Sequence, residues 1–551
     1  IKDIKPNDYF GIFPLRGKLL NVREATHKQI INNEEFKNIK MILGLEIGKK
    51  YDNENISELR YGSVLLFFDA DVDGSHIKGL FINMIDFYWP SLLQIDGFIK
   101  IFITPMIKVS RKNEVLSFYT FSDFENWKKK NEQNLWKIKY YKGLGTNTVI
   151  EAKEYFSNLQ KNTLYLNWNG IDDEEAINLA FARDKADERK NWLKNYKKNA
   201  TIDYSKSNIS YFEFINKELI HFSNYDNIRS IPNLMDGLKP AQRKVLYSAF
   251  KKNLNNDIKV AQFVGYISEH TAYHHGENSL SKTIVAMAQN FVGSNNINLL
   301  IPNGQFGTRL MGGKDASSPR YIYTYLNQIT RYIFRQEDDD LLTYLNDDGF
   351  QIEPEFYVPI IPMILVNGSE GIGTGYSTYV PKFNPIDIID NLVNKINGKN
   401  FKDMIPWYNL FEGKIEKLDK NLYYSAARYE LKNKDLIVTE LPLNYWTENF
   451  KELLDDYVVN NIISNYKNES TESKVFFIIR FKDINEEDFK KDTEGFTILE
   501  KRFGLINKIN LNNMHLYDNN GIIKKYLDIK KILEDFYKVR IYYYGKRKEL
   551  L

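Results

Sequence analysis

Three aspartates alternate in the segment DADVDG, directly after an apolar run that ends at Phe68. In extended backbone, alternate side chains share one face, so Asp69, Asp71 and Asp73 would lie together. Clustered carboxylates repel one another unless a cation neutralises them, and ligands collect at the carboxyl ends of strands in α/β sheets. Because oxygen ligands suit Mg²⁺ or Ca²⁺, the pattern predicts a Mg²⁺ site at this strand end.

Two alternatives to a Mg²⁺ site are open for this segment. An EF-hand loop also begins with D-x-D-x-D-G, but it needs a preceding helix and a glutamate at its last position, where this chain has Leu80. A solvated acidic turn that binds no metal requires no other residues at fixed positions. The EF-hand is therefore the least favoured, and the acidic turn is the simpler alternative.

Basic residues lie beside glycines in two other segments. PLRGKLLNVREA contains Arg16 and Lys18, and YYKGLGT contains Lys142 directly before Gly143. Each segment alone is more typical of a tight turn than of an anion site. Together with a Mg²⁺ site, they predict a surface that handles phosphate groups. Neither segment has the Walker A spacing, so a P-loop ATPase is not predicted.

Positive charge is concentrated between Arg229 and Ala261. This stretch contains seven basic residues (Arg229, Lys239, Arg243, Lys244, Lys251, Lys252 and Lys259) and two acidic ones (Asp236 and Asp257). Such an excess fits a surface that binds phosphodiesters. A solvated helix face has the same composition, and the charge count alone does not separate the two.

Two loops carry side chains with either a binding or a structural role. EHTAYHHGE contains His270, His274 and His275 without a zinc-type spacing, which favours phosphate contact or packing at a helix end. NGSEGIGTGYST places Ile372 between glycines. An apolar residue on such a loop is either a wedge between stacked bases or a buried anchor of the loop.

The segment FGTRLMGGKDASSPRYIYTYLN combines a glycine-rich loop, Lys314 and the pair Arg320–Tyr321. A tyrosine becomes a useful nucleophile when a neighbouring cation stabilises the phenolate or when a base removes the proton. Arg320 is suitably placed in sequence to act as that cation. The chain has 37 tyrosines, most of which must be structural.

Composition limits the classes of protein that these sites can belong to. The 551 residues are 43% hydrophobic with a net charge of +3, which indicates a folded chain of several domains. The absence of cysteine excludes disulfides, cysteine-ligated zinc and thiol nucleophiles. The longest apolar run, at 358–366, contains two prolines and is too short to span a membrane. The first residue is not methionine, so we expect a fragment of a longer intracellular protein.

The elements that would position these residues follow from hydrophobic periodicity. Residues 63–68 predict a buried strand, 76–93 an amphipathic helix and 97–109 a second strand, so a parallel or mixed sheet covered by helices is expected. Residues 172–198 predict helix in a connecting segment. The near-heptad spacing in 529–551 predicts the start of a long helix or coiled coil.

These segments, in this order, resemble the type IIA DNA topoisomerases of the single-chain eukaryotic or large-DNA-virus type. The Asn-, Ile- and Lys-rich composition is similar to that of a large DNA virus, such as an asfarvirus-like one, or of an AT-rich protist. The resemblance rests on PLRGKLLNVREA, DADVDGSHIKGL, YYKGLGT, NIRSIPNLMDGLKPAQRKVL, TAYHHGE, GGKDASSPRYIYT and PMILVNGSEGIGTGYST. It implies an α/β Toprim domain with a parallel sheet and helices (1–160), a helical connector (161–207), an α+β winged-helix domain (208–345), an α/β tower domain (346–505) and the start of a coiled coil (506–551).

The resemblance also implies roles for single residues. Tyr321 would attack a DNA phosphate to form a 5′-phosphotyrosyl bond, and Arg320 would stabilise charge at that phosphate. Ile372 would insert between base pairs. The residues implied at the scissile region are Arg229, Lys239, Lys244 and His275. Those implied to bind Mg²⁺ are Asp69, Asp71 and Asp73. Those implied to contact DNA are Arg16, Lys18, Asn21, Lys142, Gly143, Gln242, Arg243, His274, Lys314 and Ile372.

Cofactors and partners are implied as well. We expect Mg²⁺, for which Mn²⁺ or Ca²⁺ can substitute, and ATP bound outside this segment of an ATP-hydrolysing type II topoisomerase. Double-stranded DNA and a second copy of the chain are the expected partners, in the nucleus or, for a viral protein, in the host cytoplasm. The family's first Toprim glutamate would precede this chain, which leaves its metal site incomplete.

Two other functions remain as alternatives. A catalytically silent DNA-binding and DNA-bending scaffold would need the basic residues and Ile372 but not Tyr321. A Toprim nuclease or primase would need the aspartates, but it does not explain the Arg320–Tyr321 segment and is disfavoured.

Overall fold

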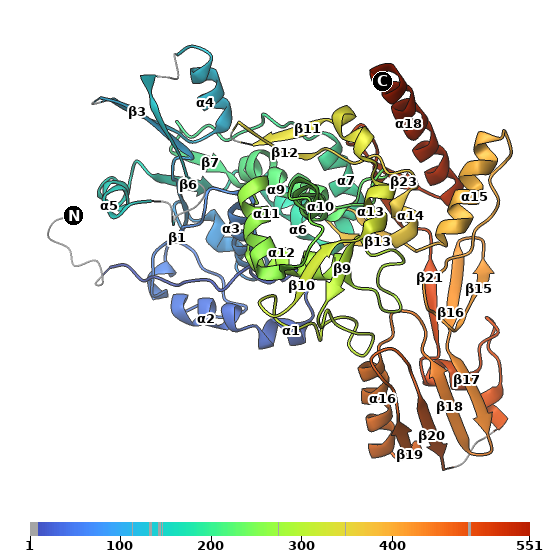
Figure 1. Cartoon of the computed structure of the whole chain (residues 1–551). Coiled ribbons are helices and arrows are strands. Elements are labelled where there is room, and N and C mark those ends of the chain that lie inside the picture. The colour runs from blue at the N-terminus through green and yellow to red at the C-terminus, as the bar shows by residue number, and fades with distance from the viewer. Residues whose placement is uncertain are drawn as a thin grey trace. The chain divides into compact units, whose positions relative to one another are not determined.

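The computed structural model describes residues 9–112, 114–131, 135–141, 145, 147–273, 275–347, 349–482 and 486–551 (Figure 1). The chain forms two compact units. Unit 1 comprises Ile1–Asn227 together with Thr374–Tyr376, and unit 2 comprises Ile228–Gly373 together with Ser377–Leu551.

Unit 1 is built on a four-stranded sheet with the order β1-β2-β6-β7. Its strands are β1 (Val64–Leu66), β2 (Ile99–Phe102), β6 (Thr163–Asn167) and β7 (Asn208–Ser210). β1 runs parallel to β2, β2 runs antiparallel to β6, and β6 runs parallel to β7. The sheet is therefore mixed, which confirms the parallel or mixed sheet predicted from the sequence: it is parallel at β1–β2 and β6–β7 and antiparallel at β2–β6.

Helices cover this sheet, and α3 between β1 and β2 is the longest of them. The helices of unit 1 are α1 (His27–Asn32), α2 (Glu34–Leu43), α3 (Val72–Tyr88), α4 (Phe121–Lys128), α5 (Val149–Ser157), α6 (Ile171–Phe181), α7 (Ala186–Lys194), α8 (Tyr211–Phe214) and the first turns of α9 (Ile220–Ser230). A π-helical turn, Ile215–Leu219, joins α8 to α9. α3 buries apolar side chains along its whole length, because it contacts both α6 and the π-helical turn.

The strand expected over 97–109 is two strands in different sheets. β2 ends at Phe102, and β3 (Ile107–Arg111) pairs with β4 (Glu114–Phe118) and β5 (Lys137–Tyr140) in an antiparallel sheet. Pro105 lies between β2 and β3, and its missing backbone N–H interrupts a ladder. The segment 161–207, expected as a helical connector, also contains strand β6, whose Leu164 and Leu166 are fully buried.

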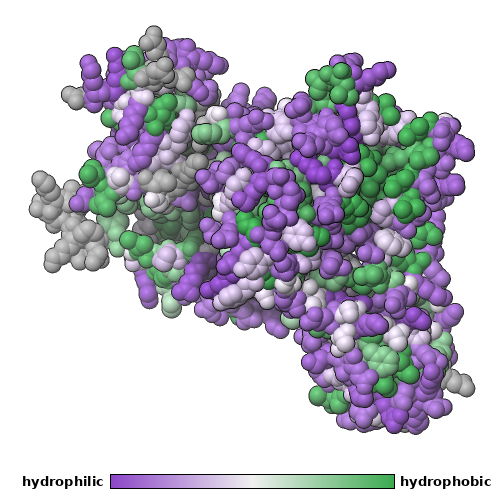
Figure 2. Space-filling view, viewed as in Figure 1, coloured by the Kyte–Doolittle hydropathy of each residue, from purple (hydrophilic) through white to green (hydrophobic). Residues whose placement is uncertain are grey.

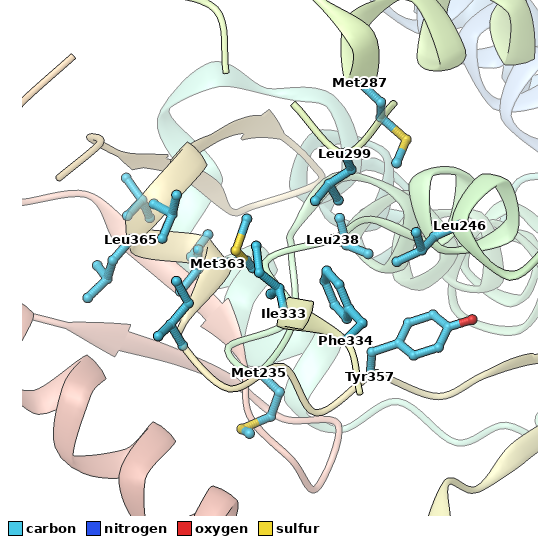
Figure 3. Close-up of a cluster of buried hydrophobic side chains, with 14 of the residues drawn as sticks. Met235, Leu238, Leu246, Met287, Leu299, Ile333, Phe334, Tyr357, Met363 and Leu365 are labelled. Atoms are coloured by element: carbon cyan, nitrogen blue, oxygen red, sulfur yellow. The ribbon is translucent and has the colours of Figure 1, made fainter. Parts of the chain in front are cut away.

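Unit 2 begins with three helices packed around one core. They are α10 (Pro240–Lys251), α11 (Val260–Thr271) and α12 (Glu277–Ala288), and each contacts the other two. Figure 3 shows side chains from α10, α12 and the following loops meeting in this core, among them Leu246, Met287 and Phe334. An antiparallel sheet with the order β8-β10-β9 belongs to the same region: β8 (Ile258–Lys259) lies between α10 and α11, and β9 (Leu300–Asn303) and β10 (Tyr323–Leu326) follow α12.

The remainder of unit 2 is rich in strands, as predicted for 346–505. Its helices are α13 (Gln328–Ile333), α14 (Met363–Asn367), α15 (Pro385–Ile396), α16 (Thr447–Val459), α17 (Ile498–Arg502) and α18 (Ile529–Leu550). Its strands are β11 (Tyr344–Asp347), β12 (Phe350–Pro354), β13 (Ser369–Ile372), β14 (Ser377–Val380), β15 (Lys414–Asp419), β16 (Leu422–Ala426), β17 (Arg428–Lys432), β18 (Asp435–Glu440), β19 (Ile463–Asn468), β20 (Phe477–Phe481), β21 (Ile506–Asn510), β22 (Met514–Tyr517) and β23 (Ile523–Tyr526).

The long helix predicted near the end of the chain is confirmed as α18. Ile532, Phe536 and Tyr543 from the near-heptad pattern are buried on one side of this helix. The continuation of α18 into a coiled coil stays a prediction. In the part of the chain that the structure describes, no helix has the length and apolar character needed to cross a membrane.

α15 presents apolar residues to solvent. Its exposed side chains include Ile386, Ile389, Val393 and Ile396, at the spacing of one helix face. Figure 2 shows hydrophobic residues at the surface over the region where Figure 1 places α15.

Candidate functional site

Tyr321 lies on the turn that leads into β10. Its side chain is 69% exposed, and its backbone N–H donates to the Ser318 carbonyl at 2.9 Å. The guanidinium carbon of Arg320 lies 5.5 Å from the centre of the Tyr321 ring, and Arg320 Nε donates to Ser318 Oγ at 3.3 Å. The next residue, Ile322, is buried in the core of unit 2. The turn therefore presents an accessible phenol beside a cation on an anchored backbone.

The glycine-rich loop before Tyr321 is held in place by its own contacts. The Asp315 carboxylate accepts hydrogen bonds from the N–H and the hydroxyl of Thr308, at 2.9 and 2.5 Å. A β carbon on Gly307 would lie 2.5 Å from the carbonyl oxygen of Gly313, so only glycine allows this close approach. Lys314 is exposed on the loop. The loop thus offers a second accessible cation in the chain segment that carries Tyr321.

Arg243 is not available to DNA in this structure, which corrects the prediction that it contacts DNA. Its side chain is only 6% exposed and donates to both carboxylate oxygens of Asp236, at 2.8 and 3.2 Å. It also donates to the Leu238 carbonyl at 2.9 Å. Asp236 in turn accepts from the backbone N–H groups of Leu238 and Tyr357. Arg243 therefore fixes the turn that precedes α10.

The other predicted residues around α10 differ in how far they are engaged. Lys239 Nζ donates to the Glu370 carbonyl at 2.6 Å, and burial lowers the pKa of Lys239. Gln242 accepts from the Lys239 N–H at 2.9 Å and so caps α10. Lys244 Nζ donates to Glu353 at 2.9 Å, and this carboxylate is buried. Lys244 is therefore held in a buried ion pair, whereas Lys239 is bound to a backbone carbonyl of β13.

Lys239 also lines a cavity of about 330 Å³ that no sequence pattern indicated. Lys382 lies in the same cavity, donates from Nζ to the Gly293 carbonyl at 2.6 Å and sits 5.1 Å from the centre of the Tyr408 ring. Burial lowers the pKa of Lys382 to about 8, and the nearby Glu370 acts in the opposite direction. A single lysine in a loop gives no periodicity or motif that distinguishes it in sequence.

This depressed pKa predicts a pH-dependent stability. An ordinary lysine titrates near 10.5, so between pH 8 and that value the unfolded chain binds more protons at Lys382 than the folded chain does. Stability attributable to Lys382 should therefore rise with pH across this window, by at most about 3 kcal/mol. Urea unfolding of the wild type and of Lys382→Met at several pH values measures the difference. Parallel pH profiles for the two proteins would contradict the assignment.

Ile372 is the last residue of β13 in the β13–β14 hairpin. Its side chain is 79% exposed, and its partner across the hairpin is Ser377. This exposure excludes the alternative in which Ile372 is a buried loop anchor. The neighbouring Gly371 packs directly on backbone, because a β carbon there would lie 2.0 Å from the Ser230 carbonyl oxygen. The hairpin therefore holds an exposed apolar side chain at its end on a tightly packed strand.

Two of the three histidines in EHTAYHHGE, His270 and His275, lie within the described residues and pack against tyrosines. His270 stacks on Tyr266, with ring centres 4.0 Å apart, so it packs within α11. His275 is half-buried, and its ring meets that of Tyr273 edge-on at 5.5 Å. His274 lies outside the described residues. Arg229 is half-buried in the last turn of α9.

The three aspartates of unit 1 do not share an extended backbone. Asp71 is the N-cap of α3 and accepts from the Gly74 N–H at 2.6 Å, so the chain is helical from Val72 onward. Asp73 forms an ion pair with Lys18 at 2.8 Å. The expectation that all three carboxylates share one face is therefore wrong, because helix capping redirects the chain after Asp71.

The donor types nevertheless suit a hard cation. Among the residues that the structure describes, no group of three His, Cys, Asp or Glu side chains could hold a metal ion. Mg²⁺ does not require such a cage, because it keeps several waters and binds through one or two carboxylates together with substrate phosphates. Asp69 and Asp71, at the end of β1 and the start of α3, fit that more open mode of binding. Asp73 is neutralised by Lys18 in this arrangement.

The remaining predicted residues of unit 1 divide between surface and interior. Arg16 and Lys18 are exposed. The Asn21 amide donates to the Phe181 carbonyl and accepts from Asn83 Nδ2, each at 3.0 Å, so both of its polar atoms have partners within the fold. Lys142 and Gly143 lie outside the described residues.

Known proteins are similar to this chain along almost its whole length. The model for the family of DNA gyrase and topoisomerase IV A subunits matches residues 229–551, and that for the C-terminal associated domain of TOPRIM matches residues 102–227. DNA topoisomerase 2 of Arabidopsis thaliana is 49% identical over 560 residues, and that of Saccharomyces cerevisiae is 49% identical over 557 residues. These alignments cover 100% and 98% of this chain, but only 38% of each relative.

A solved structure resembles the fold along almost the whole chain. The crystal structure of the Plasmodium falciparum topoisomerase II DNA-binding, cleavage and re-ligation domain matches with a TM-score of 0.78 and 47% identity. The match covers 98% of this chain and 73% of that one. These relatives are eukaryotic proteins, so the viral origin considered from composition gains no support from them. The chain belongs to the type IIA DNA topoisomerases and corresponds to their central DNA-binding and cleavage core.

Proposed function

We propose that this chain cleaves and rejoins double-stranded DNA through Tyr321, as the core of an ATP-dependent type II topoisomerase. The observation that supports the proposal most directly is the exposed Tyr321 phenol beside Arg320. The phenol oxygen attacks a backbone phosphorus and forms a phosphotyrosyl ester, while the bond to the 3′ oxygen breaks and leaves a 3′ hydroxyl. The reverse attack by that hydroxyl restores the DNA, so resealing needs no separate source of energy.

Charge on the reacting phosphate must be stabilised in both directions. Arg320 is placed to stabilise it, and Lys239 and Lys314 are available to flanking phosphates. Asp69 and Asp71 would hold Mg²⁺, which supplies charge neutralisation at a phosphate oxygen when it is bound. We assign no phosphate contact to Lys244, because Glu353 already neutralises it.

Assembly and domain organisation belong to the same proposal. Cutting both DNA strands requires one tyrosine from each of two copies, which favours a homodimer with two-fold symmetry. ATP would bind outside this chain and drive strand passage in the complete enzyme, and the family's nuclear location would follow for a cellular protein. The five-domain division with boundaries at 160, 207, 345 and 505 is part of the proposal.

Trapping of covalent protein–DNA complexes tests this function. The protein at its full natural length is incubated with supercoiled plasmid and Mg²⁺, quenched with denaturant and assayed for protein bound to 5′ DNA ends. Trapped, resealable complexes are expected. DNA bending without any trapped complex would instead support the silent scaffold.

Ile372→Ala should reduce DNA bending while leaving DNA binding nearly intact. Sharp bending of a duplex costs several kcal/mol. An apolar side chain that inserts between two base pairs and unstacks them offsets part of this cost. Energy transfer between dyes at the ends of a short duplex measures the bend. Ile386→Ala, the same change at another exposed isoleucine on α15, is the matched control. Equal bending by the Ile372 variant and the control would refute the wedge.

A further inference from the structure

A π-helical turn packs against the first turns of α3. The turn covers Ile215–Leu219, and π-helical turns are rare and concentrated at functional sites. Contact between the two elements is close, since a β carbon on Gly79 would lie 3.2 Å from a methyl group of Leu219. Asp71 and Asp73 lie at the start of this same helix. The backbone that carries these aspartates therefore rests on the π-helical turn.

Glu218 is the polar link between the two elements. Its carboxylate accepts a hydrogen bond from Ser75 Oγ at 2.7 Å and one from Lys78 Nζ at 2.5 Å. Ser75 Oγ also lies 3.2 Å from the Asp71 carbonyl oxygen. A short chain of contacts thus runs from Glu218 through Ser75 to the backbone of Asp71.

These groups are buried, which makes the link costly to break. Ser75 and Lys78 are largely shielded from solvent, and the Glu218 side chain is 12% exposed. Removing one partner of a buried ion pair leaves the other charge uncompensated. Burial, together with the neighbouring Glu218 carboxylate, raises the pKa of Tyr204 well above its usual value, so this phenol stays neutral. Because a tyrosine never carries a positive charge, the charge of Glu218 is balanced by Lys78, with which it forms an ion pair.

Lys18 fixes the same helix start from the other side. Its ammonium pairs with Asp73 at 2.8 Å and lies 4.6 Å from the centre of the Phe222 ring in α9. α9 continues directly from the π-helical turn. Both contacts tie the acidic start of α3 to the α8–α9 segment.

We infer that Glu218 is a positioning residue for DNA cleavage: through Ser75 and Lys78 it holds the start of α3 so that Asp69 and Asp71 can bind the metal. This inference rests on the proposed function. In this role Glu218 acts through its contacts with Ser75 and Lys78, and not as a ligand of the metal or the DNA. Its position within a π-helical turn provides the register that directs the carboxylate at Ser75 and Lys78.

Hydrogen–deuterium exchange of the metal-free protein tests the link without any catalysis. In Glu218→Gln, the amides of the first two turns of α3 should exchange about tenfold faster, since a hydrogen bond to a charged group contributes on that order. Ser75→Ala should give the same change in sign while preserving every charge. Glu213→Gln is the matched control, because Glu213 forms a more exposed ion pair with Lys217 on the same segment.

A titration of DNA cleavage with Mg²⁺ supplies the second readout. For Glu218→Gln and Ser75→Ala, the Mg²⁺ concentration at half-maximal cleavage should rise about tenfold, with cleavage recovered at saturating Mg²⁺ and with metal-free DNA binding unchanged. Glu218→Asp should partly restore the wild-type midpoint. Exchange rates and midpoints equal to those of Glu213→Gln would overturn the inference. Wild-type protein that never cleaves DNA would overturn the proposed function, while the exchange measurement would still decide the structural link.

Discussion

Replacement of Tyr321 by phenylalanine should abolish covalent attachment of the protein to DNA. The substitution removes only the phenol oxygen, so the exposed turn, the Ser318 contact and the stacked Arg320 are retained. Loss of a nucleophile typically lowers the rate of the chemical step by about 10⁵- to 10⁶-fold. Denaturant trapping on supercoiled plasmid measures the covalent complex, and a mobility shift without denaturant shows that DNA binding is unchanged.

Tyr323 provides a close control for this experiment. It lies two residues further along the chain, in β10, and is also partly exposed. Tyr323→Phe should form covalent complexes at nearly the wild-type level. If Tyr321→Phe still yields protein linked to 5′ DNA ends, another residue is the nucleophile and the proposed function must be reassigned to that residue.

Arg243→Met should destabilise the protein by about 3–5 kcal/mol, the range for breaking a buried ion pair by removing one partner. The change leaves the Asp236 carboxylate fully buried without its cation, while the volume of the side chain is nearly kept. It also frees the turn that carries Lys239 into α10. Thermal or urea unfolding of the two proteins measures the loss.

The same variant separates a structural role of Arg243 from a DNA-binding one. Lys251→Met removes an exposed positive charge from the same helix and should change stability by less than about 0.5 kcal/mol. If Arg243→Met is as stable as Lys251→Met but binds DNA more weakly, Arg243 contacts DNA and the buried pair is not its main role.

Sequence alone predicted the elements that depend on local pattern. The apolar run before Asp69 and the long helix beyond residue 529 both follow from periodicity, whereas the exposure of Ile372 was decided only by the structure. The two-strand split at Pro105 was also readable in principle, because proline interrupts a ladder. It was missed since the apolar residues continue on both sides of Pro105.

The sequence could not indicate which charged residues form buried ion pairs within the fold. Arg243 and Lys244 are neighbours in a basic stretch, yet Arg243 pairs with Asp236 in a turn seven residues earlier, and Lys244 pairs with Glu353 in a strand 109 residues later. The three aspartates misled for a related reason. Their alternation is typical of a strand, but aspartate is also a favoured helix N-cap residue. Asp71 caps α3, so the backbone is helical from Val72 onward. Lys382 and Glu218 gain their surroundings only from tertiary packing.

The close packing of Gly371 has a genetic consequence. Every single-nucleotide change in a glycine codon that yields another amino acid introduces a side chain, and at this position its first carbon would meet the Ser230 carbonyl oxygen. No point mutation there can be accommodated without a shift of the strand that ends in Ile372 or of the backbone at Ser230. Any single-nucleotide change at Gly371 that alters the amino acid should therefore disturb the hairpin that presents Ile372.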